Sequence, residues 1–60
     1  MKRQDVIKNL EQEGCFLKRH GGNHDIYYNP KTGKSAPIPR HKEIPDSLYK
    51  LILKQLKIIS

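Results

Sequence analysis

The chain has 60 residues, of which 35% are hydrophobic and none is tryptophan, so it can form one small domain with a modest core but not a deep pocket closed around a small metabolite. Twelve lysines and arginines against six acidic residues give a formal net charge of +6, which favours an anionic partner such as a nucleic acid. The lone cysteine excludes an internal disulfide and no apolar stretch is long enough for a signal peptide or a membrane span, so we expect a single domain over residues 1–60 that works in the cytoplasm without a membrane.

The first predicted element is an amphipathic helix over residues 3–13. Val6, Ile7 and Leu10 fall on one side of a helical wheel, which is the periodicity of a helix that covers a core. Gly14 stands where such a helix ends.

Three short strands are predicted next, over residues 15–19, 24–28 and 34–38. Gly21-Gly22 joins the first two, and its freedom at positive φ suits a hairpin turn. Residues 29–33 have the composition of a second turn. Pro37 cannot donate a ladder hydrogen bond, so we expect the third strand to lie at an edge of the sheet or to pair only in part. Cys15 lies in an apolar run and is expected to be a small core residue.

A second helix is predicted from Pro45-Asp46-Ser47 to about Lys57, with Asp46 or a residue just before it as the N-cap. Its apolar arc is wider than a two-layer domain needs and consists of Leu48, Tyr49, Leu51, Ile52, Leu53, Leu56 and Ile59. We therefore expect Tyr49 or Leu53 to contact a second chain. The lysines of this helix lie on the opposite side, where a solvated face is the simpler interpretation.

The predicted order is thus helix, three strands, helix. We predict an α+β fold (α-β-β-β-α) in which two helices pack on one face of a small antiparallel three-stranded sheet, which is the order of double-stranded RNA-binding domains. The core should consist of leucines and isoleucines together with Phe16 and some of the tyrosines. Because a fold does not fix an activity, this order favours RNA as a partner without naming a reaction.

The histidines are the candidate metal ligands or catalytic residues. His20 and His24 would approach each other on a helix, but the glycine pair between them indicates a turn, so a zinc site is a weak interpretation. We expect no metal and no other cofactor. A Ser-His-Asp hydrolase is also disfavoured, because so short a chain has too few residues to build an oxyanion pocket.

RNA cleavage demands less, because the nucleophile is the substrate's own 2′-hydroxyl and the protein supplies a general base, a general acid and cations. His24 suits the role of base, since it begins a strand beside a turn whose N–H groups can face a phosphate. The nearby cations are Lys18, Arg19, Lys34, Arg40 and Lys42. Asp25 is not expected to orient His24, because adjacent residues of a strand point to opposite faces. These residues alone leave open that His24 is an inert surface histidine.

Several motifs carry a family likeness: "EGCFLKRHGGNHDIYYNP", Ile38-Pro39-Arg40-His41, "KEIP", and "LILKQL" in the last helix. Together with the amphipathic first helix they resemble the HicA toxins of bacterial toxin–antitoxin modules over essentially the whole chain. The most specific element is Gly22-Asn23-His24, where the family has glycine, usually serine, and histidine at the start of the second strand. Lys54-Gln55-Leu56 is a softer match.

The resemblance implies an mRNA interferase with a fold like that of double-stranded RNA-binding domains and with His24 as the catalytic residue. It also implies that Gly22 lets the RNA backbone approach closely and that a HicB-type antitoxin neutralises the protein. Asn23 replaces the usual serine but keeps a hydrogen-bonding side chain, so we expect activity to persist.

With this resemblance, the predicted function is a metal-independent endoribonuclease that serves as the toxin of a type II toxin–antitoxin module. His24 is the general base, and the general acid is water, His20 or His41. The predicted RNA-binding residues are Lys18, Arg19, Gly22, Asn23, Lys34 and Arg40. The alternatives are an RNA-binding module without catalysis, and a protein-interaction domain that uses the last helix.

Overall fold

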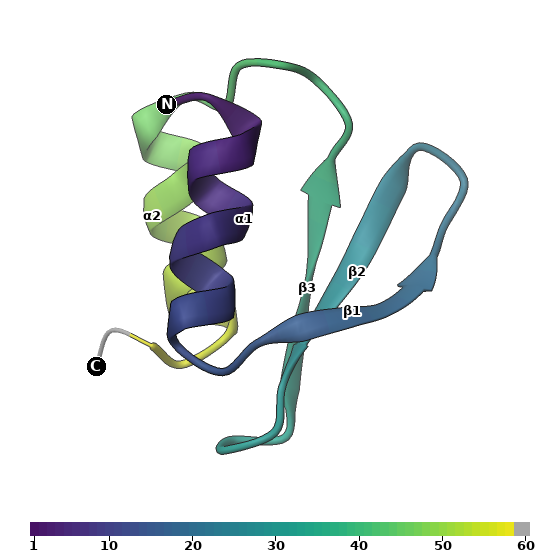
Figure 1. The fold of residues 1–60 in the computed structure, drawn as a ribbon, viewed down its shortest axis with the longest axis vertical. Helices are drawn as coiled ribbons and strands as arrows, with labels where there is room; N and C mark the ends of the chain where they lie inside the picture. Colours follow the sequence, from purple (N-terminus) through teal and green to yellow (C-terminus); the bar gives the residue numbers. More distant parts are fainter. Residues whose placement is uncertain (59–60) are drawn as a thin grey trace.

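The structure is a computed structural model that describes residues 1–58, and it contains all five predicted elements in the predicted order. They are α1 (Arg3–Gln12), β1 (Phe16–His20), β2 (His24–Asn29), β3 (Lys34–Pro39) and α2 (Asp46–Gln55) (Figure 1). The strands form one antiparallel sheet in the order β1-β2-β3. The predicted α+β fold is therefore confirmed, and so is the edge position of the strand that contains Pro37.

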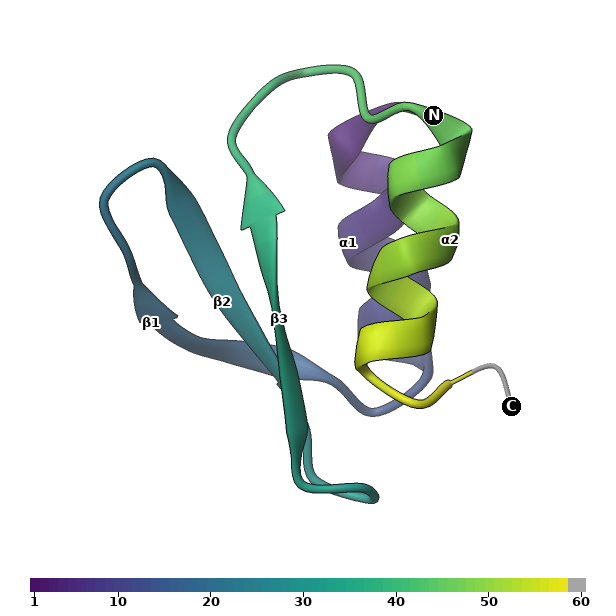
Figure 2. The ribbon, with the colours of Figure 1, turned by 180° about the vertical axis from the view of Figure 1, so that it is seen from behind.

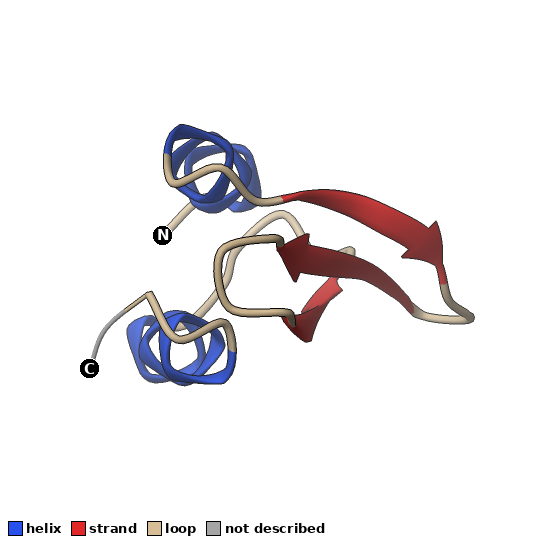
Figure 3. Ribbon diagram, turned by 90° about the horizontal axis from the view of Figure 1, so that it is seen from below, coloured by secondary structure: helices blue, strands red, loops and turns tan. Residues whose placement is uncertain are grey.

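Both helices lie to one side of the twisted sheet, and α2 runs beside β3 (Figures 2 and 3). Alternate residues of β2 divide between the two sides of the sheet. Asp25, Tyr27 and Asn29 are buried on the side of the helices. The opposite side is here called the open face, and it carries His24, Ile26 and Tyr28 of β2 together with the residues that pair with them on β1 and β3.

The core lies between the helices and the sheet, and its buried apolar residues are Val6, Leu10, Cys15, Tyr27, Ala36, Ile38, Ile44, Ile52, Leu53 and Leu56. Cys15 is therefore a small core residue, as predicted, and burial raises the pKa of its thiol. The prediction that Phe16 joins the core is wrong, because its side chain is 50% exposed. The reason is its position on β1, an edge strand whose five residues are all exposed and which extends away from the helices (Figure 3).

The wide apolar arc of α2 is largely used inside the domain. Leu53 is 8% exposed, and Tyr49 packs against the core with its hydroxyl accepting a hydrogen bond from Asn9 Nδ2 at 3.2 Å. Leu53 is therefore not available to a second chain, which corrects the expectation for that residue, whereas Tyr49 is only partly buried. Leu51, which is 48% exposed, is the apolar residue of this helix that solvent reaches most. Ile59, placed in the same arc, lies outside the described residues.

Both helices end in the same backbone motif. In each, the second residue beyond the cap donates its N–H to the carbonyl five residues earlier, at 2.9 Å, which is the closure of a Schellman motif. The residue in the left-handed conformation is Gly14 (φ 89°) after α1 and Lys57 (φ 59°) after α2. At its start, α2 has Pro45 as the N-cap, with no side-chain hydrogen bond to the helix.

The turn between β2 and β3 is fastened to the end of α2. Asn29 Nδ2 and Thr32 Oγ1 both donate to the carbonyl oxygen of Leu56, at 2.8 and 3.0 Å. Gly33 closes this turn at φ 73°, as its composition predicts. Within residues 1–58, no helix has both the length and the apolar character needed to cross a membrane.

Candidate active site

The short turn that follows β1 delivers His24 to the start of β2. Gly21 N–H donates to the carbonyl oxygen of His24 at 2.7 Å. A Cβ added at Gly21 would lie 2.9 Å from that oxygen, whereas a Cβ added at Gly22 would meet open space. Neither glycine has a positive φ, so the prediction of a positive-φ turn is wrong. Glycine is needed at Gly21 because a side chain has no room there.

His24 is exposed on the open face, opposite Pro39 of β3. Among the side chains of residues 1–58, none forms a hydrogen bond with its imidazole. Asp25, the next residue, points toward the helices and does not orient the ring, as the strand geometry predicts. The imidazole of His24 is therefore exposed and is not held by another side chain of the described residues.

His41 shares a groove with His24. This groove has a volume of about 430 Å³, and its lining includes both histidines, the prolines of β3, and Leu48 and Leu51 of α2. An adjoining hollow of about 400 Å³ is lined by Asn23, His24, Arg40 and His41. The structure thus brings the predicted base, one of the two histidines proposed as acid, and Asn23 to the same surface.

His20 lies on the other side of the sheet. It pairs with Asp25 across β1 and β2, and its Nδ1 lies 2.8 Å from Asp25 Oδ1. The sheet therefore separates His20 from His24. Within the described residues 1–58, no three His, Cys, Asp or Glu side chains gather closely enough to hold a metal ion.

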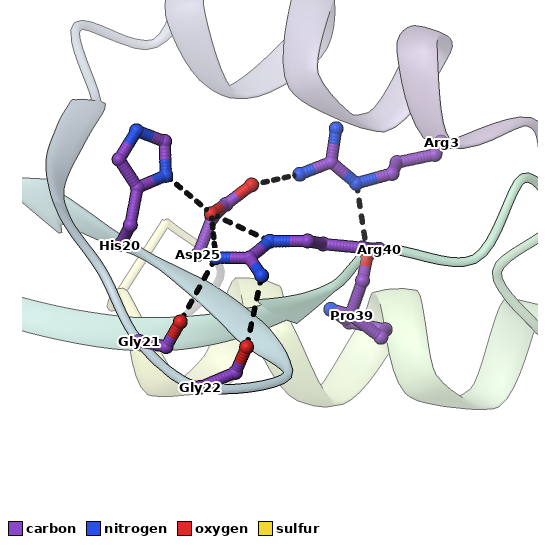
Figure 4. Close-up of polar contacts among 7 residues, drawn as sticks. All are labelled: Arg3, His20, Gly21, Gly22, Asp25, Pro39 and Arg40. Atoms are coloured by element: carbon purple, nitrogen blue, oxygen red, sulfur yellow. Dashed lines mark hydrogen bonds and ion pairs between the residues drawn. The ribbon is translucent and has the colours of Figure 1, made fainter.

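Asp25 is the centre of a polar network that supports the turn (Figure 4). Arg3 Nη2 donates to its Oδ2 at 2.6 Å, and Arg40 Nε donates to its Oδ1 at 3.0 Å. The hydrogen bond from Arg40 and, next, the one with His20 lower the pKa of Asp25 to about 2. The carboxylate is therefore ionised at neutral pH and joins the start of α1, the end of β1 and the loop after β3.

Arg40 continues this network into the turn itself. Its Nη1 donates to the carbonyl oxygen of Gly22 at 2.8 Å, and its Nη2 donates to that of Gly21 at 2.9 Å (Figure 4). With the bond from Nε to Asp25, all three nitrogens of the guanidinium have partners within the protein. Arg40 thus holds the backbone of the turn that precedes His24.

The chain is similar to proteins of one known family. A family model described as "HicA toxin of bacterial toxin-antitoxin" matches residues 3–58. The chain belongs to the HicA toxin family. A chain in the crystal structure of the E. coli HicAB toxin–antitoxin complex has the same fold with a TM-score of 0.81 and 33% sequence identity, over 97% of the present chain and 100% of that chain. The comparison with curated proteins gave no match.

The predicted cations do not all lie at the site of this HicA-family protein. Lys18 and Arg19 are on β1, and Lys18 Nζ lies 5.3 Å from the centroid of the Tyr28 ring. Lys34 pairs with Asn29 at the far end of the β2–β3 ladder from His24, about 17 Å along the strand. Arg19 pairs with Ile26, two residues from His24, whereas the ammonium of Lys18 lies toward the end of the sheet that carries Lys34.

The supporting role of Asp25 and Arg40 in this HicA-family site has no clear signal in the sequence. From the sequence, Arg40 is predicted to be an RNA-binding cation, and Asp25 is only predicted not to orient His24. The contacts arise from the register of the sheet, in which Asp25 pairs with His20 of β1 and with Ile38 of β3. Ile38 lies two residues before Arg40. A register of this kind depends on strand pairing and on a bulge in β1, neither of which is local to the residues concerned.

Proposed function

We propose that this HicA-family protein is the toxin of a toxin–antitoxin module and that it cleaves mRNA in the cytoplasm as a metal-independent endoribonuclease, with His24 as general base. The observation that carries the proposal is the exposed imidazole of His24, which has no hydrogen-bond partner among residues 1–58 and lies at the rim of a groove that it shares with His41. Membership of the HicA family and the likeness to a chain of a HicAB toxin–antitoxin complex support the biological role.

The reaction needs no group beyond the RNA and two proton carriers. Histidine is mostly neutral at cytoplasmic pH, so the His24 ring can accept the proton of a 2′-hydroxyl. The 2′-oxygen then forms a bond to the adjacent phosphorus while the bond from phosphorus to the 5′-oxygen breaks. The leaving 5′-oxygen takes a proton, and the products are a 2′,3′-cyclic phosphate and a 5′-hydroxyl.

We assign the general acid to His41. It lines the same groove as His24, whereas His20 lies across the sheet with its Nδ1 against Asp25. Asn23 lines the hollow beside both histidines and can hydrogen-bond the substrate with its amide. The N–H of Gly22 and the guanidinium group of Arg19 can stabilise the phosphate, whereas Lys18, which lies over Tyr28, is placed for a phosphate farther along the RNA.

The partner that we propose for regulation is a HicB-type antitoxin. The solved relative is described as part of a HicAB complex, and the net charge of +6 favours an acidic partner surface as well as RNA. A partner that covers the groove would prevent substrate from reaching His24.

The test is cleavage of a long single-stranded RNA by the purified chain in EDTA, with the wild type compared with His24→Gln and His20→Gln. We expect His24→Gln to abolish cleavage while retaining fold and RNA affinity, because glutamine keeps a polar side chain but cannot take up the proton. His20→Gln is the matched control and should retain cleavage, since Arg3 and Arg40 still hold Asp25. If the wild type binds RNA without cutting it, the chain is the non-catalytic RNA-binding module instead.

A further inference from the structure

A β-bulge decides which side chains of β1 reach the open face. The pairing of β1 with β2 places Phe16 opposite Tyr28 and Arg19 opposite Ile26, with a shift between Leu17 and Arg19. The extra residue places Arg19 on the same side of the sheet as Phe16, where regular alternation would have turned it away. The open face therefore gathers two consecutive cations, because Lys18 also reaches it.

Aromatic rings lie among these cations. Phe16 and Tyr28 meet edge to face, with centroids 5.6 Å apart and planes at 62°. Lys18 Nζ lies over the ring of Tyr28 at 5.3 Å from its centroid. Tyr28 thus contacts both Phe16 and Lys18. The Phe16 side chain is nevertheless 50% exposed, so its ring has surface left for another partner.

We propose that Phe16 is a stacking platform for a base of single-stranded RNA, with Lys18 and Arg19 binding the flanking phosphates. A base presents a π face whatever its identity, and cations beside an exposed aromatic ring are the combination that binds single strands. This inference rests on the proposed function, whose RNA substrate it places on the open face. In a duplex the bases are stacked on each other and cannot reach Phe16, so the substrate class is single-stranded.

The distance along the sheet suits one continuous strand of RNA. His24 and Tyr28 lie on the same side of β2, four residues apart, which corresponds to about 13 Å. Phe16 pairs directly with Tyr28. A strand with its scissile phosphate at His24 therefore passes Arg19 and Lys18 before its base reaches Phe16, so the platform binds a nucleotide outside the cleaved bond.

Binding can be measured without cleavage on a His24→Gln background. Phe16→Trp on that background would introduce an indole into a chain that has no other tryptophan. The probes are a short single-stranded oligoribonucleotide, the same strand annealed to its complement, and the same backbone with abasic positions. We expect the single strand to quench the indole fluorescence, and the duplex and the abasic strand to leave it unchanged at concentrations where they bind.

Affinities of further variants on the same background separate stacking from folding. Phe16→Leu keeps an apolar side chain and should weaken binding of the single strand about tenfold or more, while binding of the abasic strand stays the same. Leu17→Ala is the matched control, because Leu17 is 39% exposed on the same strand but pairs with Tyr27 on the other side of the sheet. Tyr28→Phe should retain affinity, since the ring remains.

The outcomes distinguish this inference from the proposed function. If the wild type cleaves RNA and Phe16→Leu binds and cleaves equally well, the stacking platform is refuted and the proposed ribonuclease activity stands. The open face would then serve a protein partner instead of RNA. If the indole is quenched by single strands but the wild type never cleaves, the platform stands and the ribonuclease is refuted.

Discussion

Arg40 and Asp25 form a bond that lies beneath the candidate active site, with Nε donating to Oδ1 at 3.0 Å while the other two guanidinium nitrogens donate to the carbonyls of Gly21 and Gly22. Arginine can make these contacts at once because its donors form a planar fork, and lysine cannot. The pair therefore fixes the turn that positions His24.

The first prediction concerns this positioning. Arg40→Lys should lower kcat for RNA cleavage by about tenfold to a hundredfold with little change in KM, because the turn is no longer fixed while the positive charge remains. Initial rates on an oligoribonucleotide, measured at several salt concentrations, test it. A change in KM and in the salt dependence with kcat preserved would show instead that Arg40 binds phosphate directly.

The second prediction concerns acid stability. The pKa of Asp25 falls from 3.8 to about 2 on folding, so its ionised form is stabilised in the folded state. This contribution to the free energy of unfolding is fully present above about pH 4 and is lost as the pH falls toward 2. Urea unfolding across this range should show the loss in the wild type. Asp25→Asn should be less stable at neutral pH and should lack this part of the pH dependence; an unchanged acid profile would contradict the assignment.

The third prediction separates the two turn glycines. Gly21→Ala should lower the free energy of unfolding by about 1–3 kcal/mol, because the new Cβ would press against the carbonyl of His24, 2.9 Å away. Gly22→Ala has open space and should unfold like the wild type. If Gly22 lets the RNA backbone approach, the same variant should cleave more slowly despite its normal stability. Equal stabilities for the two alanine variants would refute the steric account.

The fourth prediction concerns the end of α2. Lys57 adopts φ 59°, a conformation that Gly14 takes in the corresponding place after α1. Lys57→Gly should therefore stabilise the protein by about 0.5–1 kcal/mol, since relief of the left-handed strain exceeds the extra chain entropy of glycine. Gly14→Ala should have the opposite effect. The urea midpoint of each variant checks this pair, and a less stable Lys57→Gly protein would count against it.

The fifth prediction concerns the general acid. If His24 must be neutral and His41 protonated, kcat/KM should rise with pH, pass through a maximum and fall again. His41→Gln should lower the maximum and remove the fall at high pH, because water then protonates the leaving oxygen. A His41→Gln profile with the same bell shape as the wild type would exclude His41 from this role.

The sequence predicts the local features of this fold well. The helix ending at Gly14 and the turn at residues 29–33 follow from periodicity and from glycine and proline chemistry, which act over a few residues. The recognition of the HicA family from Gly22-Asn23-His24 is confirmed by the family match. The position of Phe16 is not predicted, because its hydrophobicity is the same whether it faces the core or the outside of an edge strand.

The candidate site can be predicted only in part, because its geometry depends on contacts between residues that are distant in the sequence. His24 and His41 can be named as catalytic residues from their type, but their shared groove depends on how the loop after β3 meets α2. The separation of His20 from His24 depends on the register of β1. One inserted residue reverses the direction of every later side chain in a strand, so neither result can be obtained from spacing along the chain.

In the turn between β2 and β3, Asn29 and Thr32 donate hydrogen bonds to the carbonyl oxygen of Leu56 at the end of α2. This turn lies at the opposite end of the sheet from His24. Substitutions at this turn can therefore alter the stability of the domain without touching the surface around His24. Substitutions near Asn29 change how firmly the last helix is held, and substitutions near His24 change what the surface binds.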